Sequence, residues 1–181
     1  MMIKLLSRFV VQKLALNINQ QIGIVLLSTE TIWHLSYTND LQKILSHIKE
    51  INNQVLQTTD IPWNPKSLIE SILPIDEECI MRVIFIYSRS YCIPDETESL
   101  MKSHFTQYPN FFLDLLYLHE KPTATNNVQK VFDSLGYMES KASRSYENSK
   151  PKSQRLLLMW TELLGHPIHR SSIVKCHYWE F

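Results

Sequence analysis

The sequence predicts an α/β domain in which helices cover both faces of a mainly parallel sheet. Three runs of apolar, largely β-branched or aromatic residues, at 22–27, 80–88 and 111–118, have the continuous hydrophobicity of strands that are buried on both faces. Segments with apolar residues at helical spacing lie before and between these runs, as in repeated strand–helix–strand units. We therefore expect three layers, with the sheet in the middle.

The first elements are a helix and a hairpin. Residues 3–19 carry a broad apolar stripe at helical spacing, which predicts a helix covered on most sides. Only three residues separate the strand at 22–27 from a second strand at 31–36, so this pair should be antiparallel. The first 29 residues contain three basic and no acidic residues, so a mitochondrial transit peptide is the alternative interpretation of this segment.

Two helices follow the hairpin. Thr38, Asn39 and Asp40 offer side-chain oxygens that can cap a helix, and apolar residues then recur with a period of three to four over residues 41–51. A shorter helix at 66–73 should end at Pro74, because proline cannot continue a helix.

Two more helices are predicted around the third buried strand. Residues 95–105 should form a helix with acidic residues in its first turn. Asn126 or Asn127 can cap a helix that ends at Leu135, and we expect Gly136 to close it in the left-handed conformation.

The last elements are a short edge strand at 143–147 and a clear helix. Five large apolar residues form one face of this helix, which should end at Gly165 before Pro167. They are Leu156, Leu157, Trp160, Leu163 and Leu164.

The composition excludes several classes of partner. Eighteen basic and eighteen acidic residues give zero net charge among 181 residues, so no overall field draws the chain to nucleic acid or membrane. No apolar run reaches the roughly 18 residues that span a bilayer, so we expect a soluble protein. The three cysteines form no C-x-x-C pair, which favours a reducing compartment.

Motifs of catalysis are scarce. With three glycines, the sequence has no phosphate-binding loop and no nucleophile elbow. Asp114 lies within a buried strand, five residues before His119, so a small hydrolase using these two side chains is one hypothesis. A hydrogen-bonded structural role for Asp114 is the better interpretation, because no second acid stands nearby in motif spacing.

Several motifs bring a family resemblance. The order of the elements resembles the von Willebrand A fold without its first strand, and four segments resemble the MERIT family of von Willebrand A-like subunits, which belong to the BRISC and BRCA-one-A deubiquitinase assemblies. The segments are Arg82 to Arg89, Cys92-x-Pro94, Tyr108 to His119 and Leu163 to Arg170.

The resemblance implies a scaffold without catalytic activity, in the cytoplasm and nucleus. The implied partner is a BRE-type subunit with ubiquitin-conjugating-like domains. Through it the chain would join an Abraxas-type scaffold and a JAMM zinc deubiquitinase. Such an assembly cleaves sixty-three-linked ubiquitin chains in the DNA damage response and in immune signalling.

The resemblance also implies a docking peptide. Residues 1–165 would form the von Willebrand A-like domain, and residues 166–181 a partner-binding tail. The peptide is His166-Pro167-Ile168-His169-Arg170, in which Pro167 fixes the backbone and Arg170 can make bidentate contacts. Ser171 replaces a second proline usual in the family, and a simple helix stop at Gly165 to Pro167 is the alternative.

Two departures from the family concern metal and backbone pairing. Ser88-Arg89-Ser90 stands where metal-binding von Willebrand A domains carry Thr-Asp-Gly, and arginine opposes a cation, so we expect no metal-dependent adhesion site and no cofactor. The absence of the first strand should leave two backbone edges open, unless the sequence is truncated or another segment fills the gap.

A zinc-binding interaction domain is the alternative function. His166, His169, Cys176 and His177 put four possible zinc ligands in a short tail, although their spacing fits no common zinc finger. The tail ends in the aromatic residues 178–181, which we expect to pack on the domain or on a partner.

Overall fold

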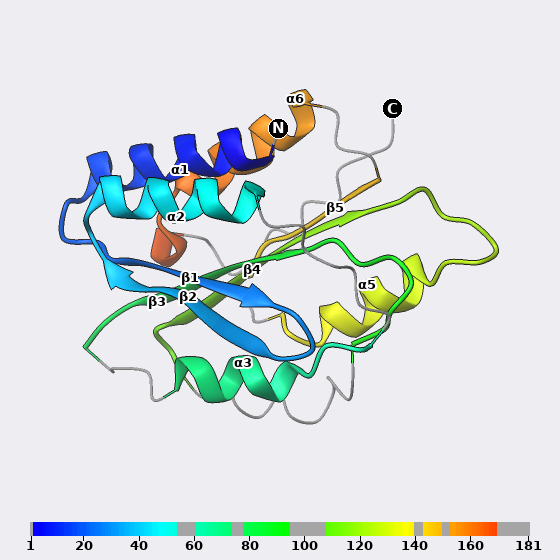
Figure 1. Cartoon of the computed structure of the whole chain (residues 1–181). Coiled ribbons are helices and arrows are strands. Elements are labelled where there is room, and N and C mark those ends of the chain that lie inside the picture. Colours follow the sequence, from blue (N-terminus) through cyan, green and yellow to red (C-terminus); the bar gives the residue numbers. More distant parts are fainter. Residues whose placement is uncertain are drawn as a thin grey trace.

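Helices lie on both faces of the strands in the computed structural model, which describes residues 2–53, 61–73, 78–94, 108–139, 143–149 and 153–169 (Figure 1). The predicted α/β class is confirmed. One face carries α1 (Met2–Leu16), α2 (Leu41–Asn53) and α6 (Ser153–Leu164), and the other carries α3 (Pro65–Ile72) and α5 (Val128–Gly136). Within these ranges, no helix is long and apolar enough to cross a membrane.

The strands form two sheets. A parallel sheet has the order β3 (Met81–Tyr87), β4 (Phe111–His119) and β5 (Ser145–Ser149), and a separate antiparallel hairpin joins β1 (Ile22–Leu27) to β2 (Thr31–Thr38). The edge strand predicted at 143–147 forms two residues later, as β5. The helix predicted at 95–105 lies outside the described residues.

The helix starts follow from local side-chain chemistry. Asp40 caps α2, because its Oδ1 accepts a hydrogen bond from the Lys43 amide at 3.1 Å. Asn64 caps α3 through the Lys66 amide at 3.0 Å, with Pro65 in the first helical turn. The capping segment at 38–40 is therefore correctly predicted, with Asp40 as the cap.

The end of α5 corrects one expectation. Gly136 is the last residue of the helix and does not adopt a positive φ, and the next residue, Tyr137, stays in the right-handed helical region. The helix ends in tight turns instead, since the amides of Met138 and Glu139 donate to the carbonyls of Leu135 and Gly136. A left-handed Gly136 is not needed to satisfy these carbonyls, so that prediction was wrong.

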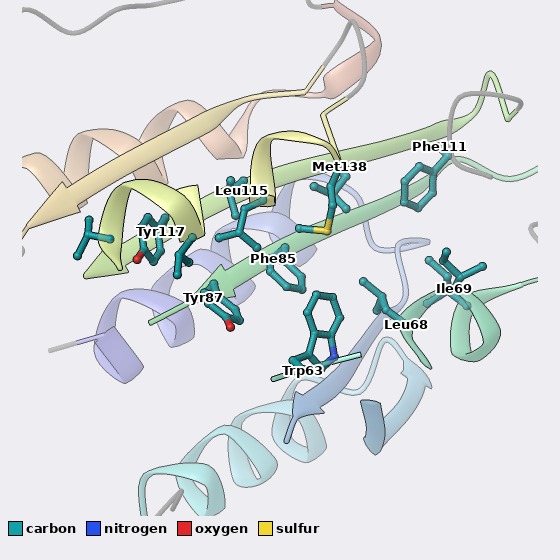
Figure 2. Close-up of a cluster of buried hydrophobic side chains, with 14 residues drawn as sticks. Trp63, Leu68, Ile69, Phe85, Tyr87, Phe111, Leu115, Tyr117 and Met138 are labelled. Atoms are coloured by element: carbon teal, nitrogen blue, oxygen red, sulfur yellow. The ribbon is translucent and has the colours of Figure 1, made fainter. Parts of the chain in front are cut away.

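A large core lies between the parallel sheet and the helices α3 and α5 (Figure 2). β4 is the middle strand of its sheet, and eight of its nine residues are buried. In Figure 2, Phe85 and Tyr87 of β3 point toward Trp63, which precedes α3. The Trp63 ring lies 5.1 Å from that of Phe85 and 6.4 Å from that of Tyr87.

The opposite face is covered by α1, which contacts both sheets. Phe9 packs on Trp160 of α6 at 4.9 Å between rings, above the parallel sheet. The next residue, Val10, and Leu14 one turn further pack with buried residues of the hairpin and α2. The helix therefore holds the two sheets together on this side.

The boundary between β1 and β3, which we call the seam, is bridged by side chains. Among the described strands, β1 pairs with β2 alone and β3 with β4 alone, so no backbone ladder joins the two sheets. At one end of the seam, Arg89 donates to the carbonyls of Leu27 at 3.2 Å and Ser28 at 2.6 Å. At the other end, the Tyr37 hydroxyl contacts the Met81 sulfur at 3.6 Å.

Gly23 makes the second of these bridges possible. A Cβ at this position of β1 would lie 2.7 Å from the Trp33 ring and 3.1 Å from the Tyr37 ring. Both aromatic side chains come from β2 and cross over β1 at the glycine. Any larger residue would push them away, so the glycine lets Tyr37 reach β3.

We predict that Trp63 is a main determinant of stability, because it also bridges the seam. Its ring is fully buried against β3, and its Nε1 donates to Thr31 of the hairpin at 3.3 Å. Trp63→Ala should lower the free energy of unfolding by about 3–5 kcal/mol. Trp63→Phe keeps most of the ring contacts, loses the hydrogen bond and should cost about 1 kcal/mol for that bond, plus a smaller packing loss.

Chemical denaturation followed by circular dichroism measures both effects. Ile61→Ala is the control, since that side chain is 59% exposed two residues away and its loss should cost less than about 0.5 kcal/mol. Equal destabilisation by Trp63→Ala and Ile61→Ala would refute the bridging role.

Candidate functional site

The predicted docking peptide begins in a single tight turn after α6. Pro167, Ile168 and His169 form a short 3-10 helix, in which the His169 amide donates to the His166 carbonyl at 3.2 Å. The Ile168 amide donates to the His166 ring Nδ1 at 3.3 Å. Pro167 is buried and anchors the turn, whereas the Ile168 side chain is 60% exposed. The turn thus exposes the apolar side chain of Ile168 to solvent, while Pro167 fixes the turn to the domain.

Two cations fix the end of α6 on which this turn stands. Lys13 of α1 donates from Nζ to the Leu164 carbonyl at 2.8 Å. Arg82 of β3 donates to the carbonyls of Leu163 at 2.6 Å and Gly165 at 3.0 Å. The last carbonyls of a helix lack partners within the helix and carry partial negative charge, so these cations both satisfy and stabilise the helix end.

Arg82 is in turn held by Asp114 in the middle of β4. The Asp114 carboxylate is fully buried, and its Oδ2 lies 2.8 Å from Arg82 Nε and 2.7 Å from Nη2. Its Oδ1 accepts the Arg144 amide at 3.0 Å, just before β5. A buried charge needs a charged partner and further hydrogen bonds, and Asp114 has both. The predicted structural role of Asp114 is confirmed.

The alternative hydrolase site is not assembled. Asp114 and His119 are five residues apart on one strand, and an odd separation directs side chains to opposite faces. His119 instead lies 3.1 Å from Glu147 of β5 and contacts the Glu120 carbonyl through Nδ1 at 2.6 Å. The two residues therefore do not share a reaction centre.

Arg89, which we expect in place of a metal-binding loop, contacts several backbone carbonyls in the structure. Besides the two carbonyls of the hairpin, its guanidinium donates to the Ile61 carbonyl at 3.2 Å. Nearby, Tyr117 donates to the Arg89 carbonyl and Tyr87 to the Cys92 carbonyl, both at 3.3 Å. These groups tie loops together at the ends of the parallel strands.

The two buried tyrosines stay protonated near neutral pH. Burial raises the pKa of Tyr87 to about 12 and raises the pKa of Tyr117 further. Removing either proton would place a phenolate in an apolar environment, which is unfavourable. Their protonated hydroxyls donate hydrogen bonds to backbone carbonyls.

Part of the predicted site falls outside the described residues. Arg170 belongs to that part, as do Cys176 and His177 of the alternative zinc site and the aromatic residues 178–181. The other two residues of the zinc hypothesis, His166 and His169, have ring centroids 5.8 Å apart. The docking peptide and the zinc site both remain predictions.

One polar cluster was missed by the sequence analysis. His34 of β2 comes close to His47 and Glu50 of α2, with one ligand atom of each within 4.8 Å of the others. The spacing His47-x-x-Glu50 puts these two side chains on one helix face and is a signal that sequence alone could give. The position of His34 beside them depends on how the hairpin packs on α2.

We predict strong coupling between Arg82 and Asp114. Asp114→Asn leaves the Arg82 charge buried without its counter-charge and should destabilise the protein by about 3–5 kcal/mol. Arg82→Met should cost a similar amount, but the double variant should cost much less than the sum of both. Denaturant unfolding of the four proteins measures the coupling, and strictly additive losses would contradict the buried pair.

Comparison with known proteins finds relatives of one kind. No protein-family model matches the chain. The chain is 23% identical to "BRISC and BRCA1-A complex member 1" of Mus musculus, over 97% of its own length and 56% of that protein. For the protein of the same name in Homo sapiens the identity is 23% over 92% of this chain and 55% of the relative.

The Xenopus laevis protein of this name is 24% identical over 92% of the chain and 54% of the relative. The chain thus spans about half the length of the curated relatives that it matches. Over most of its own length, the chain is similar to the proteins named BRISC and BRCA1-A complex member 1, in agreement with the MERIT-type resemblance.

Proposed function

We propose that this chain is a non-catalytic scaffold subunit of a BRISC or BRCA1-A type deubiquitinase complex. The observation that carries the proposal is similarity to the named members of these complexes along 92–97% of the chain. In this role the chain binds a BRE-type subunit and stabilises an assembly that also holds an Abraxas-type scaffold and a JAMM zinc deubiquitinase. The assembly works on sixty-three-linked ubiquitin chains in the cytoplasm and nucleus.

The fixed turn after α6 supports a docking role for residues 166–170. The large apolar side chain of Ile168 is exposed, next to the buried Pro167. Burying such a side chain on a partner contributes about 1.5–3 kcal/mol. Because Lys13 and Arg82 already order the helix end, the turn loses little conformational freedom when it binds. Arg170, the next residue after the turn, adds a side chain suited to bidentate contacts.

The use of the buried polar groups supports a role without catalysis. Asp114 is committed to Arg82, and the hydroxyls of Tyr87 and Tyr117 are committed to backbone carbonyls. In an active site, by contrast, ionisable groups converge on a cleft with altered pKa values near the working pH. In the described part of the chain these committed groups stabilise packing between elements.

We predict that Ile168→Asp weakens binding to a BRE-type subunit at least tenfold. The carboxylate would have to be buried at the interface, which is unfavourable without a partner charge. Full-length chain and partner can be co-expressed and then compared by copurification and isothermal titration calorimetry. Arg170→Ala should weaken binding in the same direction, since arginine often contributes strongly at interfaces.

Ile61→Asp is the matched control, because its side chain is 59% exposed against 60% for Ile168 and lies in a different part of the chain. It should bind the partner as the unchanged protein does. If Ile168→Asp and Ile61→Asp bind equally well, the turn is not the docking site. If the unchanged chain fails to copurify with any BRE-type subunit, the scaffold role itself is refuted.

A further inference from the structure

The cluster of His34, His47 and Glu50 has the composition of a metal site. Two imidazoles and one carboxylate are ligands that zinc and related divalent transition metals bind readily. Their ligand atoms all lie within 4.8 Å of one another. The cluster lies on the hairpin and α2, on different elements from the turn at 166–169, so it is independent of the proposed docking role.

The distances to Glu50 suit a single ion between the three groups. His47 Nδ1 lies 3.4 Å and His34 Nε2 lies 3.7 Å from Glu50 Oε2. Zinc bonds of about 2.1 Å in tetrahedral geometry separate neighbouring ligand atoms by about 3.4 Å. Both distances to Glu50 are therefore already close to this separation, and the two histidine nitrogens, which lie within 4.8 Å of each other, would have to move together by side-chain rotation.

The backbone directs His34 toward this place. In the hairpin register Val25 pairs with Trp33 and Ile24 pairs with Leu35, so one step along β1 spans two steps along β2. His34 is the extra residue of this bulge. A bulge changes the direction of a side chain, and bulges are frequent beside functional sites. The His34 ring consequently packs edge-on against the His47 ring at 4.9 Å.

The His47 ring gives an independent indication of a missing ligand. Its Nδ1 is buried, and no group of the described residues meets it in hydrogen-bonding geometry, although Glu50 lies 3.4 Å away. A buried polar atom without a hydrogen bond is unfavourable and requires an explanation such as a bound ion. Besides its approach to Glu50, His34 Nε2 lies 3.3 Å from the His47 carbonyl, and the tautomer of His34 that carries its proton on Nδ1 would leave the Nε2 lone pair for a metal.

The exposure of the three side chains fits a site with one open position. The histidines are 14% and 25% exposed, whereas Glu50 is 54% exposed at the solvent side. An ion here would have three protein ligands, and water could fill the fourth position. We propose that His34, His47 and Glu50 bind one divalent transition-metal ion, with Zn²⁺ as the preferred ion, and thereby clamp β2 to α2.

Titration of the metal-free, full-length protein with Zn²⁺ tests the proposal. We expect saturable binding of one ion per chain at these residues, and a melting temperature about 5–10 °C higher when free zinc is 100-fold above the dissociation constant. Glu50→Gln keeps the side-chain shape at an exposed position and should weaken this binding at least tenfold. His34→Ala with His47→Ala should abolish it and remove the melting shift.

The tail hypothesis supplies the matched control. Cys176→Ser with His177→Ala should leave this binding unchanged, and Co²⁺ should give a tetrahedral spectrum without a thiolate charge-transfer band. The proposal would be overturned in favour of the tail if the tail variant loses zinc binding while two other proteins keep it. These are Glu50→Gln and the His34/His47 double variant. Absence of saturable zinc binding in the unchanged protein would also overturn it. Melting curves in chelator verify that each variant is folded.

Discussion

The structure depends on side chains that hold two sheets together where the described strands form no backbone ladder between them. Each of the strands β1 and β3 has a hydrogen-bonded strand on one side only among the described residues. Three side chains connect the sheets instead of a ladder. Trp63 does so on one face of the sheets, and Arg89 and Tyr37 do so at the two ends of the seam. Helix α1 does the same on the opposite face. Side-chain contacts therefore connect the two sheets where the described strands have no backbone pairing.

The position of the turn at 167–169, for which we propose a docking role, follows from this arrangement. Helix α1 crosses the seam and brings Lys13 to the last carbonyls of α6, while β3 brings Arg82 to the same place. Asp114 then compensates the buried arginine from the adjacent strand. Buried ion pairs often contribute more to the choice of one arrangement than to net stability. Here the pair holds Arg82 against the last carbonyls of α6, directly before the turn at 167–169.

The sequence predicts the parts of this fold that rest on local patterns. Continuous apolar runs predict β3 and β4, and helical periodicity after the capping residues Thr38, Asn39 and Asp40 predicts α2, because these signals lie within a few residues of one another. The end of α5 was wrongly predicted, since a glycine at a helix end permits a left-handed cap but does not require it. Bridges such as Arg89 to Leu27 join residues 62 apart, and the bulge at His34 has no sequence signature. Such features depend on tertiary packing and appear only in the folded chain.

Residue-resolved hydrogen exchange on the full-length chain tests the central claim most directly, because it reports backbone pairing strand by strand. If side chains alone join the sheets, amides of β1 and β3 that face the seam should exchange at least tenfold faster than those of β4, which is paired on both sides. Amides of β1 that face β2, and amides of β3 that face β4, should remain protected by the hydrogen bonds of these pairs. Uniform slow exchange along both edges of β1 and β3 would contradict the account, since it would require a backbone partner within the seam.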